Sequence, residues 1–343
     1  MINLKSIRRS LTALRNVQWL ATTCVIVLMP GLCLSDQLPV DPDAVAHAKY
    51  TCPVYRDRSS KEQGATELSA KTSDKNALAC AADIRSAIAM EAPNDRDAHV
   101  SALTAVLRYI DHVHSLKEFD LGHTNWPEFN VRLQHAADMA GKVGAVAERN
   151  WPGDSVLTIL SAGIQGSLAG PDDPQSTLSA MDKLKRAVTK DPGALGGLGE
   201  LLIGRSYLAL PPIFGGAATK ALPYLEQAQK ISPSNPRALR YLAEVNDQLG
   251  RRQEGLRSLT ALSDLQPRNV DLQLLSDEWR MGEGLATRMQ NQQLADKFGT
   301  ERTELIRQHP TLLVRKIEPI IGHGGDNPMT GIPQYRGEPA GSH

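Results

Sequence analysis

Two short acidic segments of this sequence have residue types that could bind a metal or move a proton. The DHVH segment at 111–114 combines a carboxylate with two imidazoles, which are donors that zinc accepts. Residues two positions apart on a helix point away from each other, so His112 and His114 are poor joint ligands. The pair Asp172-Asp173 lies between two expected helices, where a turn and a helix cap are the ordinary roles. We therefore expect no metal site and no catalytic acid–base pair in these segments.

The cysteines favour a cross-link over a metal site. Two of the four, Cys24 and Cys33, lie in an apolar N-terminal run, so an exported mature chain would keep only Cys52 and Cys80. In an oxidising compartment this pair is expected to form a disulfide that closes a loop of ~28 residues. Two unpaired thiols are the alternative. Neither cysteine belongs to a CxxC pair or has a histidine at ligand spacing, so metal binding is disfavoured.

The familiar motifs of catalytic sites are missing from the sequence. It contains no GxSxG elbow, no HExxH pair and no GxxxxGK[ST] phosphate loop. Lys and Arg together number 38, equal to Asp and Glu, and no basic cluster occurs beyond the N-terminus, which argues against nucleic acid as a partner. We expect a binding protein that is not an enzyme and carries no cofactor.

The N-terminus has the pattern of an export signal. Residues 1–20 contain four basic side chains and no acid, and an apolar run over 19–34 follows. This run is shorter than the ~20 residues of a membrane span, and proline and glycine interrupt it. Cleavage before Asp36 would remove residues 1–35 as a signal peptide. We expect a periplasmic or secreted protein, and an uncleaved or lipidated N-terminus that holds it at a membrane is the alternative.

A recurring pattern of prolines and small residues predicts paired helices. Pro233 and Pro267 are 34 residues apart, which is the period of the tetratricopeptide repeat. A small residue in the second helix of each pair allows close approach, and apolar residues at three- and four-residue steps form one buried stripe. The positions 12, 8 and 5 residues before the two prolines are Ala221, Leu225 and Ala228, and Gly255, Leu259 and Leu262. Weaker copies precede Pro192, Pro152 and Pro93.

These patterns predict an all-α fold, namely a tetratricopeptide-like helical-repeat solenoid with capping C-terminal helices. We expect helix pairs over 98–148, 155–190, 195–231 and 237–265, a preceding helix over 78–90 and a helical stretch over 271–309 that caps the stack. The expected organisation is a signal peptide at 1–35, an irregular segment at 36–77, a repeat domain at 78–310 and an extended or disordered tail at 311–343.

The segment PPIFGGAAT at 211–219 interrupts one helix pair and is the most distinctive part of the chain. Its two prolines end the preceding helix, and its glycines permit positive φ and close backbone approach. Ile213 and Phe214 are costly to leave in water, so they either pack on neighbouring helices or line a pocket. The preceding helix contains Gly196, Gly197, Gly199 and Gly204, which could reflect tight packing, room for a ligand or a loose helix start.

The segment Gly204–Pro233 resembles the T component of tetratricopeptide-associated TRAP transporters. The likeness rests on an aromatic residue, a Pro-Pro and Gly-Gly loop and a Lys-Ala pair: Tyr207, Pro211, Pro212, Gly215, Gly216, Lys220 and Ala221. It implies a helical scaffold with an internal apolar cavity that binds a hydrophobic small molecule and the transporter's periplasmic solute-binding protein. The residues expected to bind ligand or partner are Tyr207, Pro211, Pro212, Ile213, Phe214, Gly215 and Gly216. The alternative is an adaptor for envelope assembly that binds proteins and no small ligand.

Overall fold

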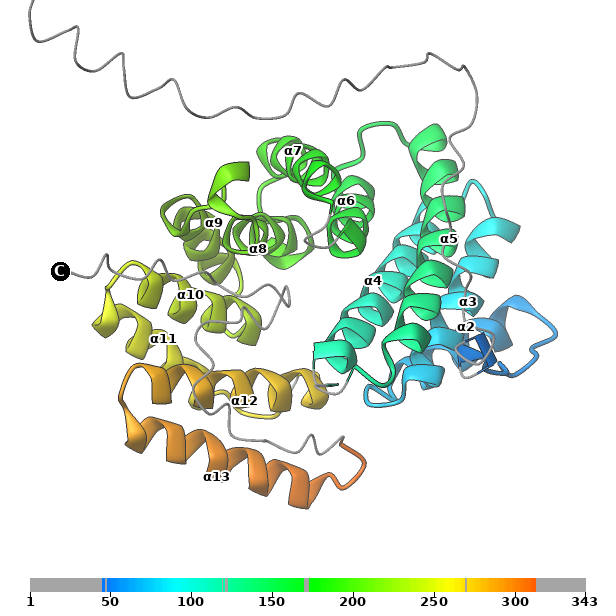
Figure 1. Ribbon diagram of the computed structural model, residues 1–343. Coiled ribbons are helices and arrows are strands. Elements are labelled where there is room, and N and C mark those ends of the chain that lie inside the picture. Colours follow the sequence, from blue (N-terminus) through cyan, green and yellow to red (C-terminus); the bar gives the residue numbers. More distant parts are fainter. Residues whose placement is uncertain are drawn as a thin grey trace, which may run out of the picture. The chain divides into compact units, whose positions relative to one another are not determined.

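The computed structural model describes residues 45–46, 48–118, 120, 123–169, 173–268 and 270–312, which belong to one compact unit. The expected signal peptide and residues 313–343 of the expected tail lie outside the described residues. Regular structure within the described ranges is entirely helical, which confirms the all-α prediction (Figure 1).

The predicted helices occur close to their expected positions. The α-helices are α2 (Arg58–Ser69), α3 (Lys75–Glu91), α4 (Arg96–Glu118), α5 (Trp126–Asn150), α6 (Ser155–Ala169), α7 (Pro174–Lys190), α8 (Ala194–Ala209), α9 (Ala218–Ile231), α10 (Pro236–Gln248), α11 (Arg252–Ser263), α12 (Leu272–Arg288) and α13 (Gln292–Gln308). A short 3-10 turn, η1 (Pro212–Phe214), follows α8. The bounds of α3 to α13 lie close to the predicted ones because apolar residues recur along these helices and most of them begin or end near a proline or glycine.

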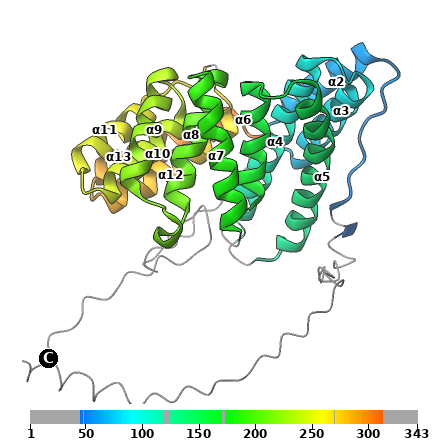
Figure 2. The same cartoon turned by 90° about the horizontal axis from the view of Figure 1, so that it is seen from above.

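Consecutive helices pack in pairs, and each pair packs on the next. The pairs are α4–α5, α6–α7, α8–α9, α10–α11 and α12–α13, and contacts between α4 and α6, α6 and α8, and α10 and α12 continue the stack (Figure 1). Most of the positions that the proline spacing selects are buried, among them Ala221, Leu225, Ala228, Leu259, Leu262, Ala180, Leu184 and Ala187. In the view from above, α2 to α5 lie at one end and α11 and α13 at the other (Figure 2).

Helix α2 corrects the expectation that residues 36–77 are irregular. Its start is fixed by a capping box in which the Asp57 carboxylate accepts from Ser60 N and the Ser60 hydroxyl accepts from Asp57 N. Only Gly64 and Ala65 of this helix are buried. The sequence of α2 therefore lacks an apolar stripe, and its helicity could not be recognised from periodicity.

The helical stretch expected over 271–309 is a further helix pair. Gln290 adopts a left-handed conformation with φ 56°, and the Asn291 side chain caps α13 by accepting from Leu294 N. Trp279 of α12 is 2% exposed, and its indole Nε1 donates to Leu262 O at 2.9 Å. This hydrogen bond attaches the last pair to α11, so the pair extends the stack as well as covering its end.

The glycines of α8 have two separate structural roles. Leu195, Gly196 and Gly197 all have positive φ, so the helix begins with an irregular left-handed turn. A Cβ at Gly199 would lie 2.4 Å from Val188, and one at Gly204 would lie 2.6 Å from Leu225. The first glycines thus permit the loose start, and the later ones permit close helix approach.

No helix among the described residues is both long and apolar enough to cross a lipid bilayer.

Candidate functional sites

The loop at residues 211–216, called the 211–216 loop below, is held by its own backbone hydrogen bonds. Phe214 N donates to Pro211 O at 2.9 Å, and Gly215 N donates to Pro212 O at 2.9 Å. After the loop, Ala217 N donates to Tyr207 O at 3.1 Å, which fixes the start of α9 to α8. The expected site residues from 207 to 216 are therefore brought together in one ordered turn.

The two glycines of the 211–216 loop have distinct requirements. Gly215 has φ 86°, a left-handed conformation that side chains rarely adopt. Gly216 lies so close to the preceding helix end that a Cβ would be 1.7 Å from Leu210 O. The loop therefore needs glycine at both positions for its backbone to return to α8.

The two apolar side chains of the loop lie in different environments. Phe214 is partly buried and, like Tyr207 and Tyr224, packs against the core of α6, α7 and α8. Ile213 is 85% exposed. The two side chains therefore have different roles. Phe214 packs inward and anchors the loop, whereas Ile213 presents its side chain to solvent.

Aromatic and basic side chains surround the 211–216 loop. The rings of Tyr207 and Tyr224 stack with centroids 6.0 Å apart. Lys185 Nζ from α7 and Lys220 Nζ from α9 lie 5.1 and 5.9 Å from the Tyr207 centroid. Burial lowers the pKa of Lys185, but the contact with Tyr207 outweighs burial and the net pKa is raised. This lysine is therefore charged at neutral pH.

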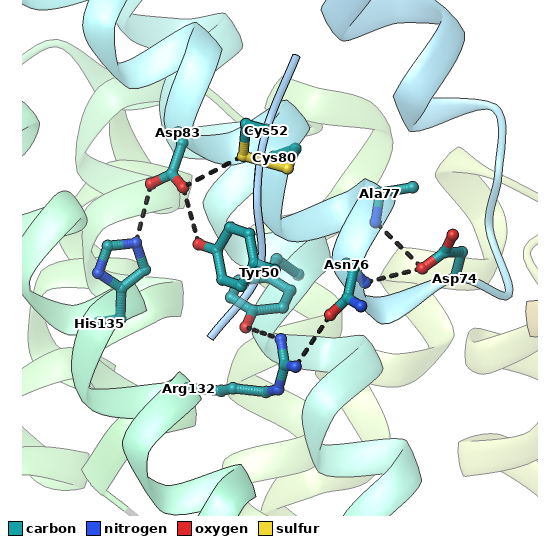
Figure 3. Close-up of a disulfide and its surroundings, with 10 residues drawn as sticks. Tyr50, Cys52, Asp74, Asn76, Ala77, Cys80, Asp83, Arg132 and His135 are labelled. Carbon is teal, nitrogen blue, oxygen red and sulfur yellow. Dashed lines mark hydrogen bonds and ion pairs between the residues drawn. A yellow bond between two sulfur atoms is a disulfide. The ribbon is translucent and has the colours of Figure 1, made fainter. Parts of the chain in front are cut away.

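A disulfide joins Cys52 to Cys80, as the cysteine count predicted (Figure 3). It attaches the segment before α2 to the middle of α3. The segment borders an open pocket of about 330 Å³, called the disulfide pocket below. The pocket is lined by Val45, Ala48, Lys49, Tyr50, Cys52, Asp83, Val131, Arg132 and His135.

Asp83 of α3 is the centre of the polar contacts in the disulfide pocket. Its carboxylate accepts from the Tyr50 hydroxyl at 2.7 Å and pairs with His135 Nε2 at 2.8 Å (Figure 3). Cys52 Sγ lies 3.9 Å from the same carboxylate, a contact without a hydrogen bond because a disulfide sulfur carries no proton. The hydrogen bond to Asp83 raises the pKa of His135, and burial raises the pKa of Tyr50.

Arg132 forms the floor of this pocket and is already satisfied within the protein. It is 2% exposed, and it donates to Glu128 at 2.8 Å and to Asn76 at 2.9 Å. Its guanidinium lies 5.5 Å from the Tyr50 ring centroid. Through these contacts Arg132 links α3 and α5 and lies against Tyr50 of the segment before α2.

A second polar group, called the charged cluster below, lies where first helices of four pairs meet. Its members are Asp111 of α4, Arg205 of α8, Arg237, Arg240 and Glu244 of α10, and Glu278 of α12. Asp111 pairs with Arg237 at 2.6 Å, and Arg240 pairs with Glu278 at 2.7 Å. Three arginines face three carboxylates, so the cluster has no net charge of its own.

Burial shapes the protonation of this cluster. Burial raises the pKa of Asp111, but Arg237 and Arg205 outweigh it, and the net pKa lies below the ordinary range. Burial lowers the pKa of the nearby His114 to about 4, so its imidazole is neutral at pH 7. The DHVH segment at 111–114 thus contributes an ion pair and a neutral histidine.

The remaining chemical candidates have structural roles. The Asp173 carboxylate caps α7 by accepting from Ser176 N at 3.0 Å, as a helix-cap role requires, whereas Asp172 lies outside the described residues. Among the residues that the structure describes, no three His, Cys, Asp or Glu side chains are grouped as metal ligands.

The chain matches no family model, and a search of curated proteins finds none that is significantly similar. The sites described above therefore carry the argument about function.

Proposed function

We propose that this protein is an exported, non-enzymatic scaffold that binds a partner protein through the 211–216 loop. The resemblance of Gly204–Pro233 to the T component of TRAP transporters makes an accessory role in periplasmic transport the specific form of this proposal. An adaptor for envelope assembly is its more general form, and both forms require the same docking site.

Two features support export and a tetratricopeptide-like architecture. The basic and apolar pattern of residues 1–34 is typical of a signal peptide, and the Cys52–Cys80 disulfide is compatible with an oxidising compartment. The 34-residue spacing of Pro233 and Pro267 coincides with helix pairs whose selected small and apolar positions are buried. Stacked helix pairs provide extended surfaces that commonly bind proteins.

The observation that carries the proposal is the exposure of Ile213 on an ordered loop. Leaving an isoleucine side chain in water forgoes about 1.5–3 kcal/mol of burial free energy. Phe214 already anchors the loop by packing against the core, so the exposed Ile213 is not required for that role. A preordered apolar side chain also loses little conformational entropy when a partner covers it.

The described residues support a protein partner more than an apolar small molecule. Phe214, Tyr207 and Tyr224 all pack against the core of α6, α7 and α8, and the first helices of the pairs meet through the charged cluster. Charged side chains that pair with each other offer an apolar molecule no favourable surface. The hydrophobic ligand implied by the family resemblance remains a separate proposal, tested by native mass spectrometry of protein purified from its own envelope.

Site-specific cross-linking in the intact cell tests the docking site. A photoreactive phenylalanine analogue replaces Ile213 in one variant and Val54 in a matched control, because Val54 is also an exposed aliphatic residue, at 95%. We expect one discrete protein to be cross-linked from position 213 and not from position 54. The cross-linked protein is then purified, and its affinity for the unmodified chain is compared with its affinity for Ile213→Asp and Val54→Asp.

The expected result is that Ile213→Asp weakens binding by at least about tenfold, which corresponds to 1.4 kcal/mol, while Val54→Asp leaves it unchanged. Identical cross-links from positions 213 and 54, or equal affinities of the two aspartate variants, would reject the 211–216 loop as a docking site.

A further inference from the structure

The basic side chains beside the 211–216 loop indicate the chemistry of the partner that the proposed function requires. Lys185 and Lys220 come from different helices and converge on Tyr207, with Nζ–centroid distances of 5.1 and 5.9 Å. Lys220 Nζ also donates to Gly215 O at 3.1 Å, two residues from Ile213. Lys220 thus lies against the loop that carries the exposed Ile213, and Lys185 lies beside Tyr207 at the end of α8 from which this loop leaves.

The local charge around the loop is positive. Asp182 lies 3.7 Å from Lys185, but its side chain is 66% exposed, so water screens this pair. Lys220 contacts the neutral carbonyl of Gly215, so this contact does not compensate the positive charge of the lysine. Two lysines and one aspartate therefore give a net charge of +1 to the group around Tyr207 and the 211–216 loop.

The lysines are also preordered. The face of a tyrosine ring attracts a cation, and the Tyr207 ring is itself held by stacking on Tyr224. A lysine that is already held in place loses less side-chain entropy when it meets a carboxylate than one that moves freely in water. The loop and its two cations therefore form one preorganised surface.

We infer that the partner is a protein with an apolar pocket for Ile213 and with Asp or Glu side chains at the rim of that pocket. Protein interfaces commonly have an apolar centre and a polar rim, and a side chain that projects from one surface requires a recess in the other. Opposite charges at the rim accelerate association and select the partner. This inference rests on the proposed function and specifies the chemistry of its binding site.

An anionic membrane surface is a less suitable occupant. A single myristoyl chain gives only marginal membrane binding, and Ile213 offers far less apolar area than such a chain. Two lysines add only a weak electrostatic attraction to an anionic surface. A protein pocket can enclose the same isoleucine on all sides, which makes it the better match for one projecting side chain.

The test measures association kinetics with the purified protein that is cross-linked at position 213. The variants are Lys185→Glu/Lys220→Glu and the exposed single variant Lys220→Glu. The matched control, Arg257→Glu/Arg307→Glu, makes the same change in net charge at two exposed arginines of α11 and α13. Circular dichroism melts verify that every variant is folded, and rates are measured at about 50 and about 300 mM salt, where the Debye length differs more than twofold.

We expect the double lysine variant to lower the association rate about tenfold at low salt and by much less at high salt, with Lys220→Glu intermediate and the control unchanged. If Ile213→Asp abolishes binding while the lysine variants match the control, the docking site is correct and the acidic rim is wrong. If neither Ile213→Asp nor the lysine variants affect binding, or if no cross-link forms at position 213, both proposals fail. Sedimentation with phosphatidylglycerol vesicles that depends on Ile213 and Lys220 would replace the protein partner with a membrane.

Discussion

Asp111 of α4 and Arg237 of α10 form an ion pair of 2.6 Å across 126 residues of sequence. Arg205 of α8 approaches the same carboxylate at 3.7 Å, and Glu278 of α12 approaches Arg237 at 3.6 Å. Another ion pair, Arg108 to Asp271, also joins α4 to the start of α12. Side chains of the charged cluster therefore connect the beginning of the helix stack with its end.

Removing Asp111 is expected to destabilise the fold strongly. Asp111→Ala leaves Arg237 and Arg205 without their shared carboxylate in a mostly buried position, which costs about 3–5 kcal/mol of unfolding free energy. Urea denaturation followed by circular dichroism measures this change. The matched control is Asp182→Ala, which removes an exposed carboxylate and should change stability by less than about 0.5 kcal/mol. Equal effects of the two substitutions would show that the charged cluster does not hold the stack together.

Periodicity and proline spacing predicted the helix pairs because each helix has one apolar stripe, a local property of the sequence. The charged cluster could not be predicted in the same way. Arg237, Arg240 and Glu278 resemble solvated surface residues when read along the chain, and only the packing of α4, α8, α10 and α12 brings them together. The histidine spacing of the DHVH segment at 111–114 argued against a metal site, but it gave no sign that Asp111 would pair with two arginines.

The disulfide pocket also contains one contact that the sequence predicted and one that it did not. The even number of cysteines that follow the expected signal peptide predicted the Cys52–Cys80 bond. Nothing in the sequence indicated that Asp83 and His135, 52 residues apart, would meet beside it. In the 211–216 loop, the sequence identified the segment, but it could not separate the anchoring Phe214 from the exposed Ile213.

The Cys52–Cys80 disulfide is expected to contribute measurably to stability. For a loop of 28 residues, the chain-entropy relation gives about 3.5 kcal/mol. The double variant Cys52→Ser/Cys80→Ser removes the bond without leaving an unpaired thiol, and its unfolding free energy should fall by about 2–4 kcal/mol. Reduced wild-type protein is the control and should match the double variant. Mature protein denatured before reduction should give no reactive thiol and afterwards two, so two thiols at the outset would contradict the bond.

The pairing of His135 with Asp83 predicts a small dependence of stability on pH. The pKa of His135 is raised above its ordinary 6.5 in the folded protein, so its charged form is favoured by folding. The stabilisation is therefore complete below about pH 6.5 and is lost as the pH rises through the folded pKa. Both side chains are partly exposed, which limits the effect to about 0.2–1 kcal/mol.

Unfolding free energies of wild type and His135→Gln between pH 5.5 and about 8.5 measure this contribution. The difference between the two proteins should shrink as the pH rises, and the imidazole should titrate above its ordinary pKa by NMR. Parallel pH profiles of the two proteins would show that the contact with Asp83 does not favour the charged histidine.

Gly216 is expected to be the glycine of the 211–216 loop at which an added side chain meets the backbone directly. A Cβ there would lie 1.7 Å from Leu210 O, a backbone atom that cannot move without opening the end of α8. Gly216→Ala should therefore lower the unfolding free energy by about 1–3 kcal/mol and displace Ile213. Gly284→Ala is the matched control, because a Cβ at this exposed helical position meets no atom within 4 Å and alanine should stabilise the helix by about 0.5–1 kcal/mol. Urea denaturation of both variants gives the comparison, and a neutral effect of Gly216→Ala would mean that the loop can shift away from α8.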